Sequence, residues 1–257
     1  MMRFPLRLTA DLTLARLAQK LCLAQGARPI QFVDAAEILH QDSNRPVSHE
    51  RIREIVSSRS PVVWIGGSEP LDHPGISHLV RAITETDHFV FLETDGTRLR
   101  RRLHEFQPMS RLFLTVRLEP GAQRPASKSL QEGAWELAAE GIRAARLSGF
   151  LMCVHVCVHA ETELGEMAEL IPLARTLDGM VITPANGGSN STSLYAATLR
   201  RKTAEARKLI GSKWWEFFSW FVELLVSGQR NATRSVEETG VHIEQEAHAN
   251  GESVRVV

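Results

Sequence analysis

The residues best placed for chemistry are a glycine pair and a carboxylate that follow a short apolar run. Val62 to Ile65 leads into Gly66, Gly67, Ser68, Glu69 and Pro70, and a helical pattern of apolar residues begins soon afterwards. This order predicts a strand, a tight turn and a helix. In parallel α/β proteins ligands bind at such turns, where glycine lets them approach the backbone. Glu69 would then stand at the rim of a pocket, although the same residues also suit a plain turn with a solvated carboxylate.

A second group of reactive residues alternates along one predicted strand, namely Cys153, His155, Cys157 and His159. Alternate residues of a strand share one face. Neighbouring members lie about 6.6 Å apart, so one tetrahedral zinc ion cannot bind the whole row, although two of them could bind with partners from other strands. We favour packed, hydrogen-bonded side chains. The role of Cys153, His155 and Cys157 stays open.

Composition limits the function classes. The 257 residues are 43% hydrophobic, which suits one barrel-sized α/β domain, and 30 basic residues balance 30 acidic ones. No overall charge therefore favours nucleic acid or an anionic membrane. The local cluster of Arg98, Arg100, Arg101 and Arg102 could bind phosphate, but a solvated helix face is the interpretation we favour. The absence of a long apolar stretch or a signal-peptide core, together with only three cysteines, predicts a cytoplasmic protein without a disulfide framework.

The elements that must position these residues alternate along the chain. We predict parallel strands near residues 29–33, 62–66, 88–93, 111–118, 150–158 and 179–183. Helices are predicted between them, except that residues 34–45 suggest a polar loop and residues 119–131 a flexible connection. Asp72 is a plausible cap of the helix after His73. The alternation predicts a parallel sheet or partial barrel whose active face lies at the carboxyl ends of the strands.

Segments at both ends lie outside this alternation. Residues 1–28 contain an amphipathic helix, predicted at 10–25, that suits a cover for one end of the core better than a membrane-surface helix. Residues 185–226 predict a helical extension, in which Trp214–Val226 is nearly all apolar and must pack on the barrel or on a partner protein. Residues 227–257 are rich in charged and small polar residues and predict a disordered tail.

Several short pieces, taken in order, resemble the radical SAM superfamily, in particular its hopanoid-biosynthesis branch, which attaches an adenosyl group to a hopene. The pieces are GGSEPLDHP, FVFLETDG, LHEFQP, GIRAARLSGF, LDGMVITP and the Trp-rich end, and together they span roughly residues 5–226. The resemblance implies an α/β fold, a six-unit (β/α) partial TIM barrel over residues 29–184. It also implies that Glu69 holds the amino group of S-adenosylmethionine, in a pocket edged by Gly66, Gly67, Ser68, Pro70 and Thr94.

The chain departs from this family at two places. Ser68 replaces a glycine beside the glutamate, and serine tolerates a positive φ poorly. More importantly, the family carries a C-x3-C-x2-C motif after the first strand, whose thiolates bind a [4Fe-4S] cluster, whereas no cysteine lies between Val33 and Val62. His40 and His49 are poor substitutes for the soft cluster. We therefore predict that the cluster is absent and that S-adenosylmethionine is not cleaved reductively.

Three hypotheses follow, with no catalytic residue assigned. The first is a degenerate radical-SAM-like protein that retains a nucleoside or S-adenosylmethionine pocket. The second is a non-catalytic scaffold that docks a partner through Trp214–Val226. The third is an active radical SAM enzyme with a non-standard cluster site, in hopanoid or related lipid biosynthesis. The missing cluster ligands favour the first two.

Overall fold

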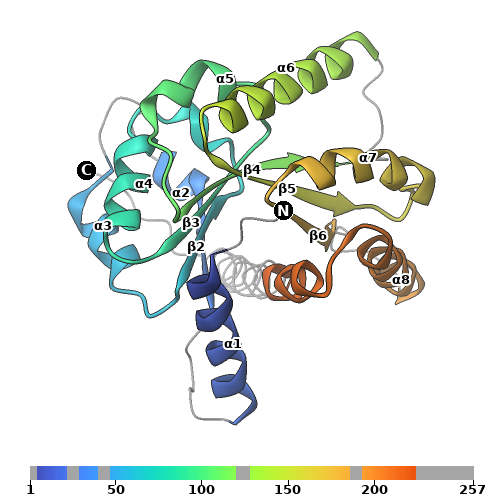
Figure 1. Cartoon of the computed structure of the whole chain (residues 1–257), viewed down its shortest axis with the longest axis horizontal. Coiled ribbons are helices and arrows are strands. Elements are labelled where there is room, and N and C mark those ends of the chain that lie inside the picture. The colour runs from blue at the N-terminus through green and yellow to red at the C-terminus, as the bar shows by residue number, and fades with distance from the viewer. Residues whose placement is uncertain (1–4, 22–28, 40–46, 120–127, 186–192, 224–257) are drawn as a thin grey trace, which may run out of the picture.

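One parallel sheet organises the chain (Figure 1). The computed structural model describes residues 5–21, 29–39, 47–119, 128–185 and 193–223. Six strands pair in chain order, each parallel to the next, and the sheet curls into a half-barrel whose edges are the first and last strands. They are β1 (Ile30–Asp34), β2 (Val62–Gly66), β3 (Phe89–Thr94), β4 (Leu112–Leu118), β5 (Leu151–Val158) and β6 (Gly179–Pro184). The predicted six-unit partial TIM barrel is confirmed.

Helices alternate with the strands, and a helical extension follows β6. The helical elements are α1 (Leu6–Lys20), α2 (Ala35–Leu39), α3 (His49–Val56), η1 (Pro70–Asp72), α4 (Ile76–Glu85), α5 (Leu99–Arg102), η2 (Leu103–Glu105), α6 (Lys128–Leu147), α7 (Leu164–Thr176) and α8 (Ser193–Ile210). A further helix covers residues 213–223. None of these helices combines the length and apolarity that a membrane crossing requires within the described residues.

Several local predictions were wrong. The predicted loop at residues 34–45 begins with a helix instead, because α2 follows β1 directly and the Asp34 carboxylate accepts a hydrogen bond from the Ala36 N–H, while residues 40–45 lie outside the described ones. The predicted connection at 119–131 overlaps the first turn of α6, and its residues 120–127 lie outside the described ones. Asp72 does not cap α4, whose N-cap is Gly75, but forms an ion pair with Arg98.

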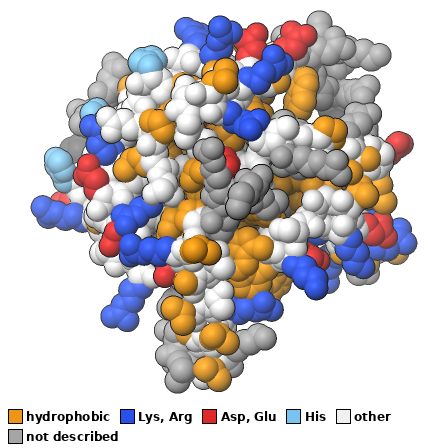
Figure 2. All heavy atoms as spheres, viewed as in Figure 1, with side chains coloured by type: hydrophobic (Ala, Val, Ile, Leu, Met, Phe, Trp, Pro, Cys, Tyr) orange, Lys and Arg blue, Asp and Glu red, His pale blue; other side chains and the backbone are white. Residues whose placement is uncertain are grey.

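The first helix begins and ends earlier than predicted, at Leu6 and Lys20 rather than near residues 10 and 25. Residues 22–28 lie outside the described ones. Leu8 and Leu12 are fully buried against the sheet, whereas Leu14 and Leu17 are exposed. The helix projects from the body of the molecule, and Figure 2 shows apolar side chains along it.

The convex face of the sheet carries the larger apolar core. Outward residues of the strands, such as Val63, Ile65, Val90 and Leu92, pack with apolar side chains of the flanking helices. Strands with both faces covered are near-continuous apolar runs, and every residue of β2 and β3 is buried. This continuity is what made the strands recognisable in the sequence.

The concave face is filled by aromatic side chains. Trp64, Phe91 and Phe113 lie side by side on β2, β3 and β4, with ring centroids 5.2 Å and 4.4 Å apart and nearly parallel planes. From the helix of residues 213–223, Phe218 packs on Trp64 and Phe91, and Trp215 packs on Phe218 and beside Gly179. The half-barrel is therefore plugged by its own C-terminal extension.

Gly179, the first residue of β6, provides a test of this plug. A Cβ atom there would overlap the indole ring of Trp215. We expect Gly179→Ala to lower the free energy of unfolding by about 1–3 kcal/mol, because a well-packed core does not accept an added methyl group. Urea denaturation measures the effect.

Gly165→Ala is the matched control, because Gly165 lies exposed in α7 and an added Cβ meets no atom there within 4 Å among the described residues. Alanine is the better helix former, so this variant should be unchanged or more stable by up to about 1 kcal/mol. Equal loss in the two variants would contradict the close packing of Trp215 on β6.

Candidate functional site

Glu69 lies where the sequence predicted it, at the carboxyl-end rim of the sheet. It follows β2 through Gly67 and Ser68 and caps η1, because its Oε1 accepts the Leu71 N–H at 3.0 Å. The same oxygen accepts the Thr94 hydroxyl at 2.7 Å, and Oε2 accepts the Asp95 N–H at 2.8 Å. The carboxylate thus ties the turn after β2 to the turn after β3.

The Glu69 side chain is half-buried, which shapes its chemistry. Burial raises the pKa of this carboxyl above its ordinary value, although the Asp95 and Leu71 N–H groups and the Thr94 hydroxyl act against that rise. A carboxylate offers about four acceptor positions, and these hydrogen bonds use three of them. The remaining position on Oε2 can accept one further donor.

The two glycines of the turn serve the chain's own side chains. Gly67 has a φ of +89°, which favours glycine, and a Cβ there would collide with the Asp34 carboxylate. A Cβ on Gly66 would lie 3.3 Å from Nε1 of Trp64 and 3.4 Å from Glu93. The prediction that these glycines admit a ligand is untested, whereas their role in admitting Asp34, Trp64 and Glu93 is direct.

Ser68 and Pro70 complete the predicted edge. Ser68 is exposed, and Pro70 is buried in the first turn of η1. Among the described residues Asp87 is the one non-glycine residue with a positive φ, so Ser68 avoids the strained conformation that the sequence suggested.

A second centre, which the sequence analysis did not assemble, lies on the concave face nearby. Nδ1 of His155 on β5 is 2.7 Å from Oε2 of Glu93 on β3, and both side chains are buried. The Trp64 indole N–H donates to the same oxygen at 2.9 Å. Arg117 of β4 lies 3.5 Å from the other oxygen of Glu93 and donates to the Gly67 carbonyl at 3.2 Å.

Glu93 and His155 each stabilise the charged form of the other. Burial alone would raise the pKa of Glu93, but the attraction of His155 and Arg117 and the hydrogen bonds from His155 and Trp64 hold that pKa below its ordinary value. Burial likewise would lower the pKa of His155, but Cys157 and Glu93 raise it well above its ordinary value. We therefore describe the pair as a carboxylate and an imidazolium.

The other ring nitrogen of His155 faces two hydroxyl- or thiol-bearing residues. Nε2 is 2.8 Å from Oγ1 of Thr183 on β6 and 3.8 Å from Sγ of Cys157 on its own strand. Both nitrogens of the ring are thus engaged within the protein. Within the described residues no group of at least three His, Cys, Asp or Glu side chains is arranged to hold a metal ion.

The alternation of Cys153, His155 and Cys157 does place them on the concave face, but their surroundings differ. Cys153 is fully buried among the aromatic side chains, and burial raises the pKa of its thiol. Cys157 is partly exposed near the end of β5. Glu93 and Thr183 occupy the same face by the same alternation, two residues after Phe91 and Val181. Strand parity was the signal that could have identified them.

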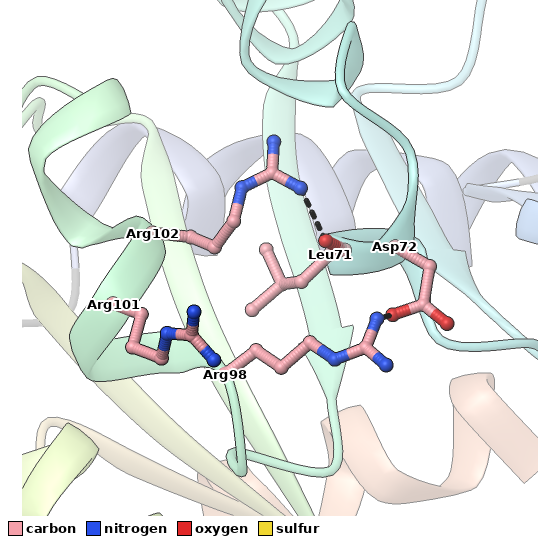
Figure 3. A pocket seen from close by; sticks show the side chains of 5 residues that line it. All are labelled: Leu71, Asp72, Arg98, Arg101 and Arg102. Atoms are coloured by element: carbon pink, nitrogen blue, oxygen red, sulfur yellow. Dashed lines mark hydrogen bonds and ion pairs between the residues drawn. The ribbon is translucent and has the colours of Figure 1, made fainter. Parts of the chain in front are cut away.

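The arginine cluster forms a cavity on the outer side of the rim, of about 410 Å³ (Figure 3). Arg98, Arg101 and Arg102 line it together with Leu71 and Asp72. Arg102 does more than face solvent, because it binds the Leu71 carbonyl and forms an ion pair with Glu105. Arg98 is paired with Asp72. These arginines hold the turn that carries Glu69 against α5.

Comparisons with known proteins show little beyond this geometry. No known protein family matches the chain, and no curated protein matches it significantly. Among solved structures, it is similar to an archaeal TYW1 crystal structure with a TM-score of 0.41 and 14% identity, over 69% of this chain and 57% of that one. A TYW1 structure with a lysine-pyruvate adduct bound gives 0.39 and 12%, over 62% and 54%. The chain spans little more than half of those structures, and these values assign it to no family.

The raised pKa of His155 predicts how stability depends on pH. The unfolded chain releases this proton near the ordinary histidine pKa of about 6.5, whereas the folded protein keeps it. The folded state then binds more protons, so the free energy of unfolding should fall as the pH rises from about 6.5 to 8. The slope should approach 1.4 kcal/mol per pH unit, roughly the value for one proton. Below this range the contribution is fully present.

Urea denaturation across this pH range, with two histidine variants, tests the assignment. His155→Gln should be less stable than the wild type near the lower end and should have a flatter pH dependence. His78→Gln, in an exposed position of α4, should retain the wild-type slope. A wild-type slope in His155→Gln would contradict the imidazolium assignment.

Proposed function

We propose that this protein is a radical-SAM-like half-barrel without iron-sulfur cluster chemistry, and that it binds S-adenosylmethionine or a related nucleoside at the rim beside Glu69. The observation that carries the proposal is the Glu69 carboxylate, held by Leu71, Thr94 and Asp95 with one acceptor position left. The order of the sequence pieces that resemble the radical SAM superfamily is a separate support. The assignment to hopanoid biosynthesis rests on that resemblance alone.

The chemistry of the carboxylate suits the amino group of the ligand. An ammonium group carries three donors and a positive charge, and a charge-assisted hydrogen bond to a carboxylate is among the stronger polar contacts in proteins. Glu69 is already oriented by its donors, so its own ordering cost on binding is small. The neighbouring Asp95 is exposed and adds negative charge at this edge.

The part of the chain that the structure describes does not bring together the thiolates that a [4Fe-4S] cluster needs. No cysteine occurs in residues 34–61, after the first strand. Cys153 is buried within the aromatic core, and the other thiol of the sheet, Cys157, lies beside His155 on β5. A cluster needs several thiolates at one place, and these two cysteines do not supply them.

A scaffold that docks a partner through its Trp-rich helix is the second candidate. The aromatic side chains of residues 213–223 argue against it, because Trp215, Phe218 and Phe221 are buried on the concave face of the sheet. Trp220 is 40% exposed, and its ring lies 5.7 Å from the Arg16 guanidinium. This helix is therefore used mainly to complete the core of its own chain.

Calorimetric titration with S-adenosylmethionine tests the ligand. We expect the wild type to bind it and Glu69→Gln to bind at least tenfold more weakly, because a hydrogen bond between charged groups contributes about 1.5–3 kcal/mol. Glu85→Gln, at an exposed position of α4, is the matched control and should bind like the wild type.

Thermal unfolding of both variants separates lost binding from lost folding, since Glu69 also joins two turns. Adenosine serves as the probe for a nucleoside that lacks the amino group. Failure of the wild type to bind either compound would refute the proposal. Equal binding by the wild type and a folded Glu69→Gln variant would place the ligand elsewhere.

Anaerobic reconstitution with iron and sulfide tests the missing cluster. We expect no stoichiometric iron and no brown absorbance, and no 5′-deoxyadenosine after dithionite and S-adenosylmethionine are added, because the thiolate ligands are lacking. A stoichiometric cluster together with that product would favour an active enzyme with a non-standard site. This outcome is independent of whether the ligand binds at Glu69.

A further inference from the structure

We propose that Cys157 is a nucleophilic thiol, activated by the pair of His155 and Glu93, that reacts with small carbon electrophiles entering at the carboxyl-end rim. Cys157 is partly exposed, whereas His155 and Glu93 behind it are buried. The thiol, the imidazole and the carboxylate form a connected series, with Sγ 3.8 Å from Nε2 and Nδ1 2.7 Å from the carboxylate. This proposal does not depend on the binding of S-adenosylmethionine beside Glu69.

The arrangement has the parts of an activated nucleophile. Such a nucleophile is activated by a neighbouring base or cation that a third group holds in place. The His155 imidazolium is the neighbouring cation, and Glu93 orients its ring and stabilises its charge. Trp64 and Arg117 in turn hold Glu93, so this orienting group is fixed from two further strands. A histidine that served packing alone would not require a hydrogen-bonded carboxylate that Trp64 and Arg117 hold in turn.

Two residues compete for the proton on Nε2. Thr183 is closer to it than Cys157, at 2.8 Å against 3.8 Å. However, Thr183 is buried, with 2% of its surface exposed, and cannot meet an outside molecule. Cys157 is therefore the accessible nucleophile, and Thr183 is a buried competitor for the imidazole N–H.

The reaction balances without a cofactor. The thiol proton passes to water, and the negative charge on the sulfur is stabilised by the neighbouring imidazolium, which keeps its own protons throughout. With iodoacetamide, the sulfur forms a bond to the methylene carbon while the carbon–iodine bond breaks and iodide leaves with its electron pair. Sulfur is alkylated, and no other reactant is consumed.

Iodoacetamide labelling of the native protein near neutral pH tests the proposal, with mass spectrometry of peptides to locate the adduct. We expect Cys157 to react at least tenfold faster in the native protein than in urea-denatured protein, because only the folded protein places its sulfur 3.8 Å from Nε2 of a histidine that Glu93 orients. Cys153 is the internal control and should stay unlabelled until the protein unfolds, because it is fully buried.

Variants separate activation from packing. Glu93→Gln and His155→Gln should slow labelling of Cys157 to near the denatured rate, with thermal unfolding used to confirm that each is folded. Thr183→Val keeps the shape of the side chain but removes the competing hydroxyl, so it should leave the rate unchanged or increase it. If these side chains served only to stabilise the fold, the His155 and Glu93 variants would not slow labelling of Cys157 while Thr183→Val left it unchanged or faster.

Three outcomes would overturn the proposal. They are a native rate for Cys157 no faster than the denatured rate, a rate that Glu93→Gln and His155→Gln leave unchanged, and a fall in rate in folded Thr183→Val. Should the His155 and Glu93 variants fail to fold, the proposal is still tested by the native rate of Cys157 against the denatured rate and by the rate in Thr183→Val. None of these measurements depends on S-adenosylmethionine binding, so the proposals can fail separately.

Discussion

The concave face of an open sheet must be covered, and the rest of this structure follows from how the chain covers it. A closed eight-stranded barrel fills its interior with side chains from its own strands, but the six strands here leave that interior open to one side. The helix of residues 213–223 supplies Trp215 and Phe218, which join the stacked rings of Trp64, Phe91 and Phe113 in one apolar cluster. Each fully buried large apolar side chain contributes about 1.5–3 kcal/mol relative to an exposed one. The Trp-rich segment is thus part of the core, which explains its near-continuous apolar character.

The plug also determines where polar chemistry can lie. On β3 the concave face changes from apolar at the amino end to polar at the carboxyl end, in the order Phe89, Phe91 and Glu93. Trp64 contacts both the apolar and the polar part of this face, because its ring belongs to the aromatic stack while its N–H donates a hydrogen bond to Glu93. A buried charge is costly unless it is paired and hydrogen-bonded. The Glu93 and His155 pair meets that condition, because the two side chains contact each other and Trp64 donates a hydrogen bond to Glu93.

The sequence predicted the sheet better than the site. Strands buried on both faces are long apolar runs, and all six were found within about two residues. The short α2 was missed, because one turn and a half of helix leaves too little periodicity to recognise. Glu69 and Thr94 were predicted at one rim because each follows a strand. Glu93 was missed as the partner of His155, because strand parity gives the face of a residue but not the partner that it meets across two intervening strand pairings.

Arg117 connects the two polar centres of the rim. Its guanidinium donates to the carbonyl of Gly67 in the turn before Glu69 and lies within ion-pair distance of Glu93. Gly67 in turn admits the Asp34 carboxylate from the end of β1. The turn that leads to Glu69 and the carboxylate that pairs with His155 therefore share one guanidinium. Arg117 also contributes to holding the pKa of Glu93 below its ordinary value, after the larger effect of His155. A single side chain on β4 thus connects the rim beside Glu69 with the polar end of the concave face.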